Sequence, residues 1–139
     1  MAQKIREIMT GAPRTVGPQT SVVEVARIMR DDDIGAVLVA EGDTLRGLVT
    51  DRDLVVRVMS LGGNAEDHSV ADACSEQLVS VSPDDDISRA VELMRGHAVR
   101  RLPVVEDGRP VGIVSLGDLA VERDTDSALS EISAAEPNE

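Results

Sequence analysis

The chain has 139 residues, a formal net charge of −12 and no phenylalanine, tyrosine or tryptophan. Its length suits a domain of ordinary size with an aliphatic core. The acidic balance argues against general DNA or RNA binding, because nucleic-acid phosphates would be repelled. The absence of aromatic rings excludes stacking platforms for single strands. Cys74 is the only cysteine, so no intramolecular disulfide is expected. Because no apolar leader or membrane-length apolar run is present, we expect a cytoplasmic protein without a membrane partner.

Apolar periodicity and turn residues predict the elements. Helical spacing is clearest from Val22 to Met29, and continuous apolar runs indicate buried strands. In chain order, the predicted elements are a short helix at Lys4–Met9, a short strand at Thr15–Val16, a helix at Val22–Asp31, strands at Ala36–Ala40 and Leu45–Thr50, a helix at Asp51–Met59, a short helix at Val70–Cys74, a short strand at Val79–Val81, a helix from about Ile87, strands at Leu102–Val105 and Val111–Ser115, and a helix from about Leu116.

The two halves of the chain repeat each other at an offset of 65 residues. Each half reads β-α-β-β-α and would bury too little surface to be stable alone. We therefore expect an α/β (α+β) fold in which two repeats, 3–60 and 70–123, pack together with approximate two-fold symmetry. Residues 61–69 are predicted to be a linker and 124–139 a flexible acidic tail that contributes little to the fold. Identical pairs at this offset include Val16/Val81, Met29/Met94, Gly47/Gly112, Val49/Val114 and Asp53/Asp118.

A hydroxyl–acid pair ends each half. Thr50 precedes Asp53 by three residues, and Ser115 precedes Asp118 by three residues, each where a strand runs into a helix. This spacing is a helix-start signature, because the hydroxyl and the carboxylate can cap backbone amides reciprocally. The plain interpretation is two helix caps. The second interpretation is two equivalent ligand sites, since a carboxylate can accept hydrogen bonds from both hydroxyls of a ribose.

The order of elements and the G-h-h-[ST]-x-x-D ending resemble a tandem pair of CBS domains, a Bateman module, over about residues 3–122. The second half carries the family pattern well in Val99-Arg100-Arg101-Leu102-Pro103 and in Gly112 to Asp118. The first half departs from it, with Gly35-Ala36-Val37-Leu38 where the family usually has a basic residue and proline. The Thr50-Asp51-Arg52-Asp53 ending resembles small stand-alone bacterial CBS-pair proteins, some of them linked to stress or dormancy.

The resemblance implies repeats packed sheet to sheet, with two clefts between them that bind adenosyl ligands in many members. It also implies that modules pair into a flat dimer. In the family the diol-binding Asp of one half faces basic residues of the other, so Thr50 and Asp53 would face Arg100 and Arg101. The alternative for the two arginines is an exposed pair that forms surface ion pairs. The complete set of expected ligand-binding residues is Thr50, Asp53, Arg100, Arg101, Val16, Ile34, Ser115, Asp118, Val81 and Val99, the aliphatic members enclosing the base.

Two functional hypotheses stay open. The first is a regulatory module for an adenine nucleotide or S-adenosylmethionine, without an obligatory cofactor. The second is a ligand-free structural module that acts through dimerisation or docking to an unknown effector protein. An enzyme is not expected, because no Ser-His-Asp order, nucleophile elbow or P-loop is present, and His68 and His97 lack a second metal ligand at useful spacing. The expected dimer surface comprises Leu54, Val55, Val58, Leu119 and Ala120.

Overall fold

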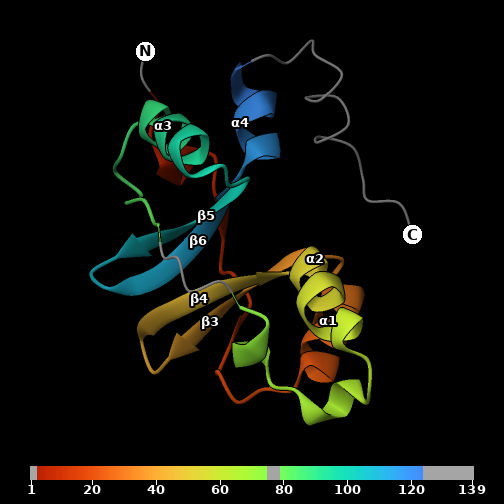
Figure 1. Ribbon diagram of the computed structural model, residues 1–139. Helices are drawn as coiled ribbons and strands as arrows, with labels where there is room; N and C mark the ends of the chain where they lie inside the picture. The colour runs from red at the N-terminus through yellow and green to blue at the C-terminus, as the bar shows by residue number, and fades with distance from the viewer. Residues whose placement is uncertain (1–2, 75–78, 124–139) are drawn as a thin grey trace. The chain divides into compact units, whose positions relative to one another are not determined.

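The computed structural model describes residues 3–74 and 79–123 (Figure 1). Residues 121–123 are described by their backbone alone. The expected tail at 124–139 lies outside the described residues. The chain forms two compact units: a central unit, Pro13–Leu78, and a split unit, Met1–Ala12 with Val79–Glu139. Each unit contains one three-stranded sheet, which confirms the predicted α+β fold. In the described part of the chain, no helix is long and apolar enough to span a membrane.

The central unit has the strand order β2-β3-β4. β2 (Thr15–Val16) runs parallel to β3 (Ala36–Glu41), and β3 is antiparallel to β4 (Thr44–Thr50). α1 (Val22–Asp32) is capped by Ser21, whose hydroxyl accepts a hydrogen bond from Glu24 N. The apolar stripe of α1 packs on the sheet, as the periodicity predicted. The buried core residues are Val22, Val25, Ile28, Met29, Val37, Val39, Val49, Val58, Val70 and Ala73.

The predicted helix at Asp51–Met59 is helical but not uniformly α-helical. α2 spans only Asp51–Asp53, a π-helical stretch follows at Leu54–Val58, and a 3-10 turn ends it at Met59–Leu61. The apolar pattern could not reveal the change of winding, because both windings place residues i and i+4 on nearly the same side. The chain then returns through two 3-10 turns, Ala65–Asp67 and Val70–Asp72.

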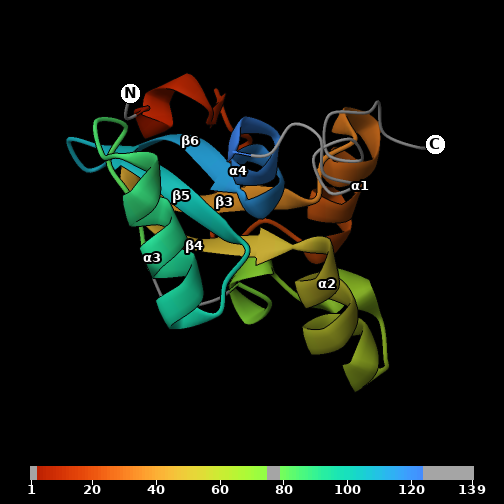
Figure 2. The same ribbon diagram turned by 90° about the horizontal axis from the view of Figure 1, so that it is seen from above.

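The split unit repeats this plan with three named strands as well, but β1 pairs on β6 and the counterpart of β2 is reduced to an isolated bridge at Val81. Its named strands have the order β1-β6-β5, and every pairing among them is antiparallel. Figures 1 and 2 show α3 and α4 on the same face of the β5–β6 hairpin. Ile87, Ala90, Met94, Leu102, Val104, Val114 and Leu119 form its buried core together with Ile5. The elements are β1 (Thr10–Gly11), α3 (Ile87–His97), β5 (Arg101–Glu106), β6 (Arg109–Ser115) and α4 (Leu116–Arg123).

The N-terminal segment belongs to the split unit. It forms a 3-10 turn at Ile5–Glu7 and then β1, which pairs with β6. Backbone hydrogen bonds run from Ile5 N to the carbonyl oxygen of Asp85 (3.0 Å) and from Ile87 N to that of Gln3 (3.1 Å). Ion pairs add to them at Lys4–Asp86, Arg6–Asp84 and Arg6–Glu106. The compact units are therefore not contiguous halves of the sequence.

The short strand predicted at Val79–Val81 is wrong in extent, since only Val81 pairs, through an isolated bridge to Val104. The first half shows why. There the amide of Leu38 donates to the carbonyl oxygen of Arg14 at 2.9 Å. Pro103 occupies the place of Leu38 and has no N–H, so the equivalent bond to Val79 cannot form.

Backbone geometry reproduces the 65-residue repeat. Asp33 and Ala98 end α1 and α3, and both adopt a left-handed backbone with φ of 54°. The ladders β3–β4 and β5–β6 are each interrupted by a register shift, between Val39 and Ala40 and between Val104 and Val105. Because the left-handed helix ends and the register shifts both recur 65 residues apart, the two units have the same local backbone geometry.

The expected dimer surface needs correction. Val58 is 2% exposed and Leu119 is 4% exposed, so both belong to the cores of their own units. Leu54 also packs against the core of the central unit. Val55 is 55% exposed and remains available for association.

Candidate functional site

The first hydroxyl–acid pair lies where β4 meets α2. Thr50 is extended, and its hydroxyl accepts a hydrogen bond from Asp53 N at 3.1 Å. Thr50 N donates to Asp53 Oδ2 at 2.9 Å, which completes a capping box. The Asp53 side chain is only 16% exposed, and its Oδ1 lies 3.6 Å from Arg57 Nε. At that distance Oδ1 is charge-balanced by Arg57 but retains its capacity to accept hydrogen bonds.

The second pair reproduces this geometry where β6 meets α4. Ser115 N donates to Asp118 Oδ2 at 2.8 Å, and Asp118 N donates to the Ser115 hydroxyl at 3.1 Å. Among the interactions of the described residues, none engages Asp118 Oδ1. Each cap therefore uses one carboxylate oxygen and leaves the other open as an acceptor. The hydroxyl protons of Thr50 and Ser115 are also available for donation, because both oxygens act as acceptors in the caps.

A loop from the end of the preceding helix is fixed beside each cap. Asp51 N donates to the carbonyl oxygen of Gly35 at 3.1 Å, and Leu116 N donates to that of Arg100 at 2.8 Å. Ile34 and Val99 occupy the same place in the two loops, and both are half-buried against their own cores. The structure thus places Ile34 next to the first cap and Val99 next to the second, each within its own unit.

The remaining predicted residues are distributed as follows. Val16 is half-buried in β2, where it pairs with Val39. Val81 is 3% exposed and belongs to the core of the split unit. Arg101 lies opposite Ser115 in the β5–β6 ladder, so Arg100 and Arg101 both lie near the second cap of their own unit. That these arginines face Thr50 and Asp53 stays a prediction.

Sequence reasoning missed Arg57 as a member of the first site. The signal was present, because Asp53 and Arg57 are four residues apart and opposite charges at this spacing meet on a helix surface. The corresponding position in the second half is Glu122. The two sites thus share their caps but differ in the charge four residues later.

The comparison with known proteins covers both halves. The family model for the CBS domain matches residues 5–60 and 70–123. The chain is 38% identical over 133 residues to CBS domain-containing protein YhcV of Bacillus subtilis, which spans 93% of this chain and 94% of that protein. It is 32% identical over 116 residues to Hypoxic response protein 1 of Mycobacterium tuberculosis, spanning 83% and 81% of the two chains.

Solved structures agree in fold. A protein from Burkholderia ambifaria described as a signal-transduction protein with CBS domains matches with a TM-score of 0.80 and 27% identity, over 91% of this chain and 96% of that one. Hypoxic Response Protein I, crystallised with two coordinated zinc ions, matches with a TM-score of 0.77 and 31% identity over 85% of this chain and 97% of that one. Among the side chains that the structure describes, those of residues 3–74 and 79–120, no three His, Cys, Asp or Glu gather as a metal site would require. With both halves matched and the repeat visible in its backbone, the chain belongs to the CBS-domain family and carries two CBS domains in tandem.

Proposed function

We propose that this chain is a non-enzymatic regulatory module that binds an adenosine-containing ligand at its two strand-to-helix caps. The observation that carries the proposal is the open carboxylate oxygen that each capping box leaves on a half-buried aspartate, Asp53 or Asp118. A ribose diol offers two hydroxyl donors, and a carboxylate is the acceptor that binds them most strongly. The ligand classes are AMP, ADP and ATP or S-adenosylmethionine.

The surroundings of the caps fit the other parts of such a ligand. The half-buried Ile34 and Val99 beside the caps, with Val16 in β2, offer aliphatic surfaces to an adenine ring. Hydroxyl protons of Thr50 and Ser115 can be donated to ribose or phosphate oxygens. Arg57 at the first cap provides a cation for phosphates. We therefore propose the first cap as the stronger phosphate site, with Arg100 and Arg101 as further cations for the nucleotide.

Ligand binding would act by favouring one state of the module over another. A ligand shifts such an equilibrium only as far as its affinities for the two states differ. We propose that the states differ in self-association as a homodimer or in docking to an effector protein. Two similar proteins, one described as a signal-transduction protein and the other as a hypoxic response protein, support a regulatory role in bacterial stress.

A thermal-shift titration with adenosine, AMP, ADP, ATP and S-adenosylmethionine tests ligand binding. A ligand at a hundredfold excess over its Kd should stabilise the protein by about 2.7 kcal/mol, which is a shift of several degrees for this size. Asp53→Ala should remove most of the shift for AMP, ADP and ATP, whereas Asp118→Ala should matter less. Arg101→Ala should weaken ADP and ATP more than adenosine. If Asp118→Ala is the more damaging change, the phosphate site is the second cap.

The purified protein provides a second, simpler test. Without tryptophan or tyrosine the chain absorbs almost nothing at 280 nm, so a nucleotide carried through purification should be evident near 260 nm. Absence of any thermal shift at millimolar ligand would favour the alternative function, a ligand-free interaction module. One observation favours that alternative independently: the large exposed side chains Val55, Met59 and Leu61 follow the first cap.

A further inference from the structure

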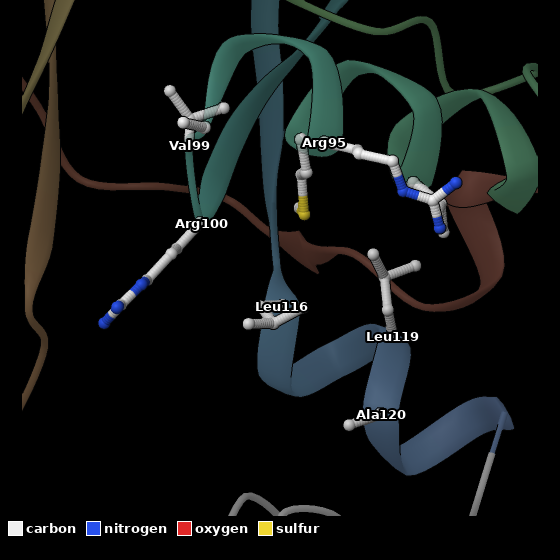
Figure 3. Close-up of a pocket in the computed structure, with 9 residues that line it drawn as sticks. Arg95, Val99, Arg100, Leu116, Leu119 and Ala120 are labelled. Carbon is white, nitrogen blue, oxygen red and sulfur yellow. The ribbon is translucent and has the colours of Figure 1, made fainter.

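The split unit has a groove between α3 and α4, which we call the α3–α4 groove. Its volume is about 570 Å³, within the range of sites that enclose ligands in proteins. Figure 3 shows Leu116, Leu119 and Ala120 on one wall, while Arg95 and Arg100 extend in different directions from the other. Leu116 is 43% exposed, so apolar surface of the groove is open to an occupant. The lining residues are Val91, Met94, Arg95, Ala98, Val99, Arg100, Leu116, Leu119 and Ala120.

The charge of this groove is unusual for so acidic a chain, because its lining includes two arginines and no acid. Arg95 and Arg100 are exposed, and neither forms an ion pair with any residue that the structure describes. Arg30, at the position equivalent to Arg95, does form one, with Asp31 at 2.8 Å. Two guanidinium groups beside apolar surface fit an occupant that is both apolar and acidic.

The equivalent positions of the central unit have the opposite character. At the 65-residue offset, the counterparts of Ala98, Arg100 and Leu116 are Asp33, Gly35 and Asp51. Asp33 and Asp51 are both exposed. An acidic segment that suits the α3–α4 groove would therefore be repelled at the corresponding surface of the central unit.

The chain itself contains a segment with the composition that the groove requires. Residues 124–139 follow α4 directly and contain no Lys, Arg or His. Their large apolar side chains are Leu129 and Ile132, and their acids are Asp124, Asp126, Glu131, Glu136 and Glu139. Because the whole chain has 26 acids against 14 cations, such a segment is repelled by most of its surroundings and attracted where cations stand without acids.

The connection to α4 makes the groove easy to reach. The eight residues of α4 rise about 12 Å along its axis, whereas six extended residues, 124–129, span about 20 Å. Leu129 can therefore return along the whole of α4 as far as Leu116. The tether also holds the segment near the groove at a concentration on the order of millimolar, so that weak contacts suffice. The other stretches outside the described residues, 1–2 and 75–78, are too short to fill the groove.

We propose that segment 124–139 folds back over α4 and fills the α3–α4 groove of its own chain. Leu129 and Ile132 enter the apolar part of the groove, and the acids of the segment lie near Arg95 and Arg100. The groove is then closed to other apolar partners until the segment is displaced. This gives the segment a role that its composition alone did not predict. The proposal depends neither on the adenosine-containing ligand nor on self-association.

Paramagnetic NMR on the full chain tests the proposal. A nitroxide is attached to Ser130→Cys in a Cys74→Ser background, which carries no other cysteine, and the relaxation of amide signals from α3 is measured. The reference is the same protein with Leu129→Ser and Ile132→Ser, which keeps the tether and every charge. We expect amides of α3 to relax about threefold faster or more when both apolar side chains are present, because their loss leaves only a small bound fraction.

Two outcomes of this measurement overturn the proposal. Equal relaxation in the two proteins means that the tether alone brings the nitroxide to α3. The second outcome comes from a mixture of nitroxide-labelled protein at natural isotope abundance with ¹⁵N-labelled protein that carries no nitroxide. Faster relaxation of α3 amides in that mixture means that the groove receives segment 124–139 from another copy and not from its own chain.

Charge reversal tests the role of the two arginines with the same nitroxide. Arg95→Glu together with Arg100→Glu should lower the relaxation of α3 amides to the level of the reference protein. Adding Asp126→Arg and Glu131→Arg to that chain should restore part of the effect, since opposite charges then face each other again. Unchanged relaxation after the first pair of substitutions overturns the proposal.

A matched control separates the groove from net charge. Arg27→Glu together with Arg46→Glu makes the same change in net charge at exposed positions of the central unit, and the fast relaxation of α3 should persist. Loss of the effect in this control would assign it to net charge and overturn the proposal. The thermal-shift titration decides ligand binding separately, because none of these outcomes depends on a nucleotide.

Discussion

Gly112 lies directly against the backbone of Thr10. A Cβ atom at Gly112 would stand 2.9 Å from the Thr10 carbonyl oxygen and 2.7 Å from Met9 Sδ. The contact exists because β1 pairs with β6 in a register that places Gly11 opposite Gly112. A glycine on β6 therefore fixes how closely the N-terminal segment can approach the sheet.

Gly112→Ala should consequently destabilise the protein by about 1–3 kcal/mol, since the backbone of β1 must move to admit one methyl group. Gly96→Ala is the matched control, because it lies in α3 with open space around it and should be neutral or stabilising by up to about 1 kcal/mol. Urea unfolding followed by far-ultraviolet circular dichroism measures both. Equal stability of the two variants would show that β1 does not pack closely on β6.

Ile5→Ala should cost about 2–5 kcal/mol, because Ile5 is fully buried in the core of the split unit and its loss leaves a cavity. Native-state hydrogen exchange should then show weaker protection in β5 and β6 than in β3 and β4. Ile8→Ala, at a half-buried position in the same segment, should cost less. Weaker protection confined to β3 and β4 would contradict the assignment of the segment to the split unit.

Asp53→Asn separates the capping role of Asp53 from its proposed role as diol acceptor. The amide oxygen can still accept from Thr50 N, so the unliganded variant should stay within about 0.5 kcal/mol of wild type, whereas Asp53→Ala should lose about 0.5–2 kcal/mol. Ligand shifts are then measured against each variant's own unliganded melting temperature. A full AMP shift in Asp53→Asn would show that the carboxylate charge has no part in binding.

Asp31 gives a prediction on pH. The hydrogen bond from Arg30 lowers the pKa of Asp31 below its ordinary value of 3.8. Because the folded-state pKa is the lower one, the pair contributes stability above pH 3.8 that is lost as the pH falls through the folded-state pKa. In Arg30→Gln, an NMR titration should show the pKa of Asp31 moving upward. An unmoved pKa would mean that the pair is not formed in solution.

Much of the fold was predictable because its signals are local. The helix predicted at Val22–Asp31 ends at Asp32, and the hydroxyl–acid spacing at Thr50 and Ser115 does produce two helix caps. Such features depend on residues three or four positions apart, which the sequence displays directly.

Features that depend on distant partners were not predictable in the same way. β1 contains only Thr10 and Gly11, which show no strand pattern, and Thr10 pairs with Ile113, 103 residues later. The α3–α4 groove likewise requires two helices to be placed against each other before its lining can be read. At the candidate site, the caps were predicted, but the open Oδ1 atoms of Asp53 and Asp118 became visible only with the side-chain geometry.

The split unit has a consequence for synthesis on the ribosome. Residues 13–78 form a compact unit whose internal contacts can begin to form once that stretch has emerged. Residues 3–12 are made before residues 13–78, but the core of the split unit, to which Ile5 belongs, is complete only after Val114 and Leu119 have been made. During that interval the apolar side chains of Ile5, Ile8 and Met9 lack the core residues against which they pack in the folded protein. Closing the split unit therefore requires residues 3–12 to pair with β6, which is made about 100 residues later, and such late long-range pairing leaves a nascent chain open to aggregation or to strand exchange between copies.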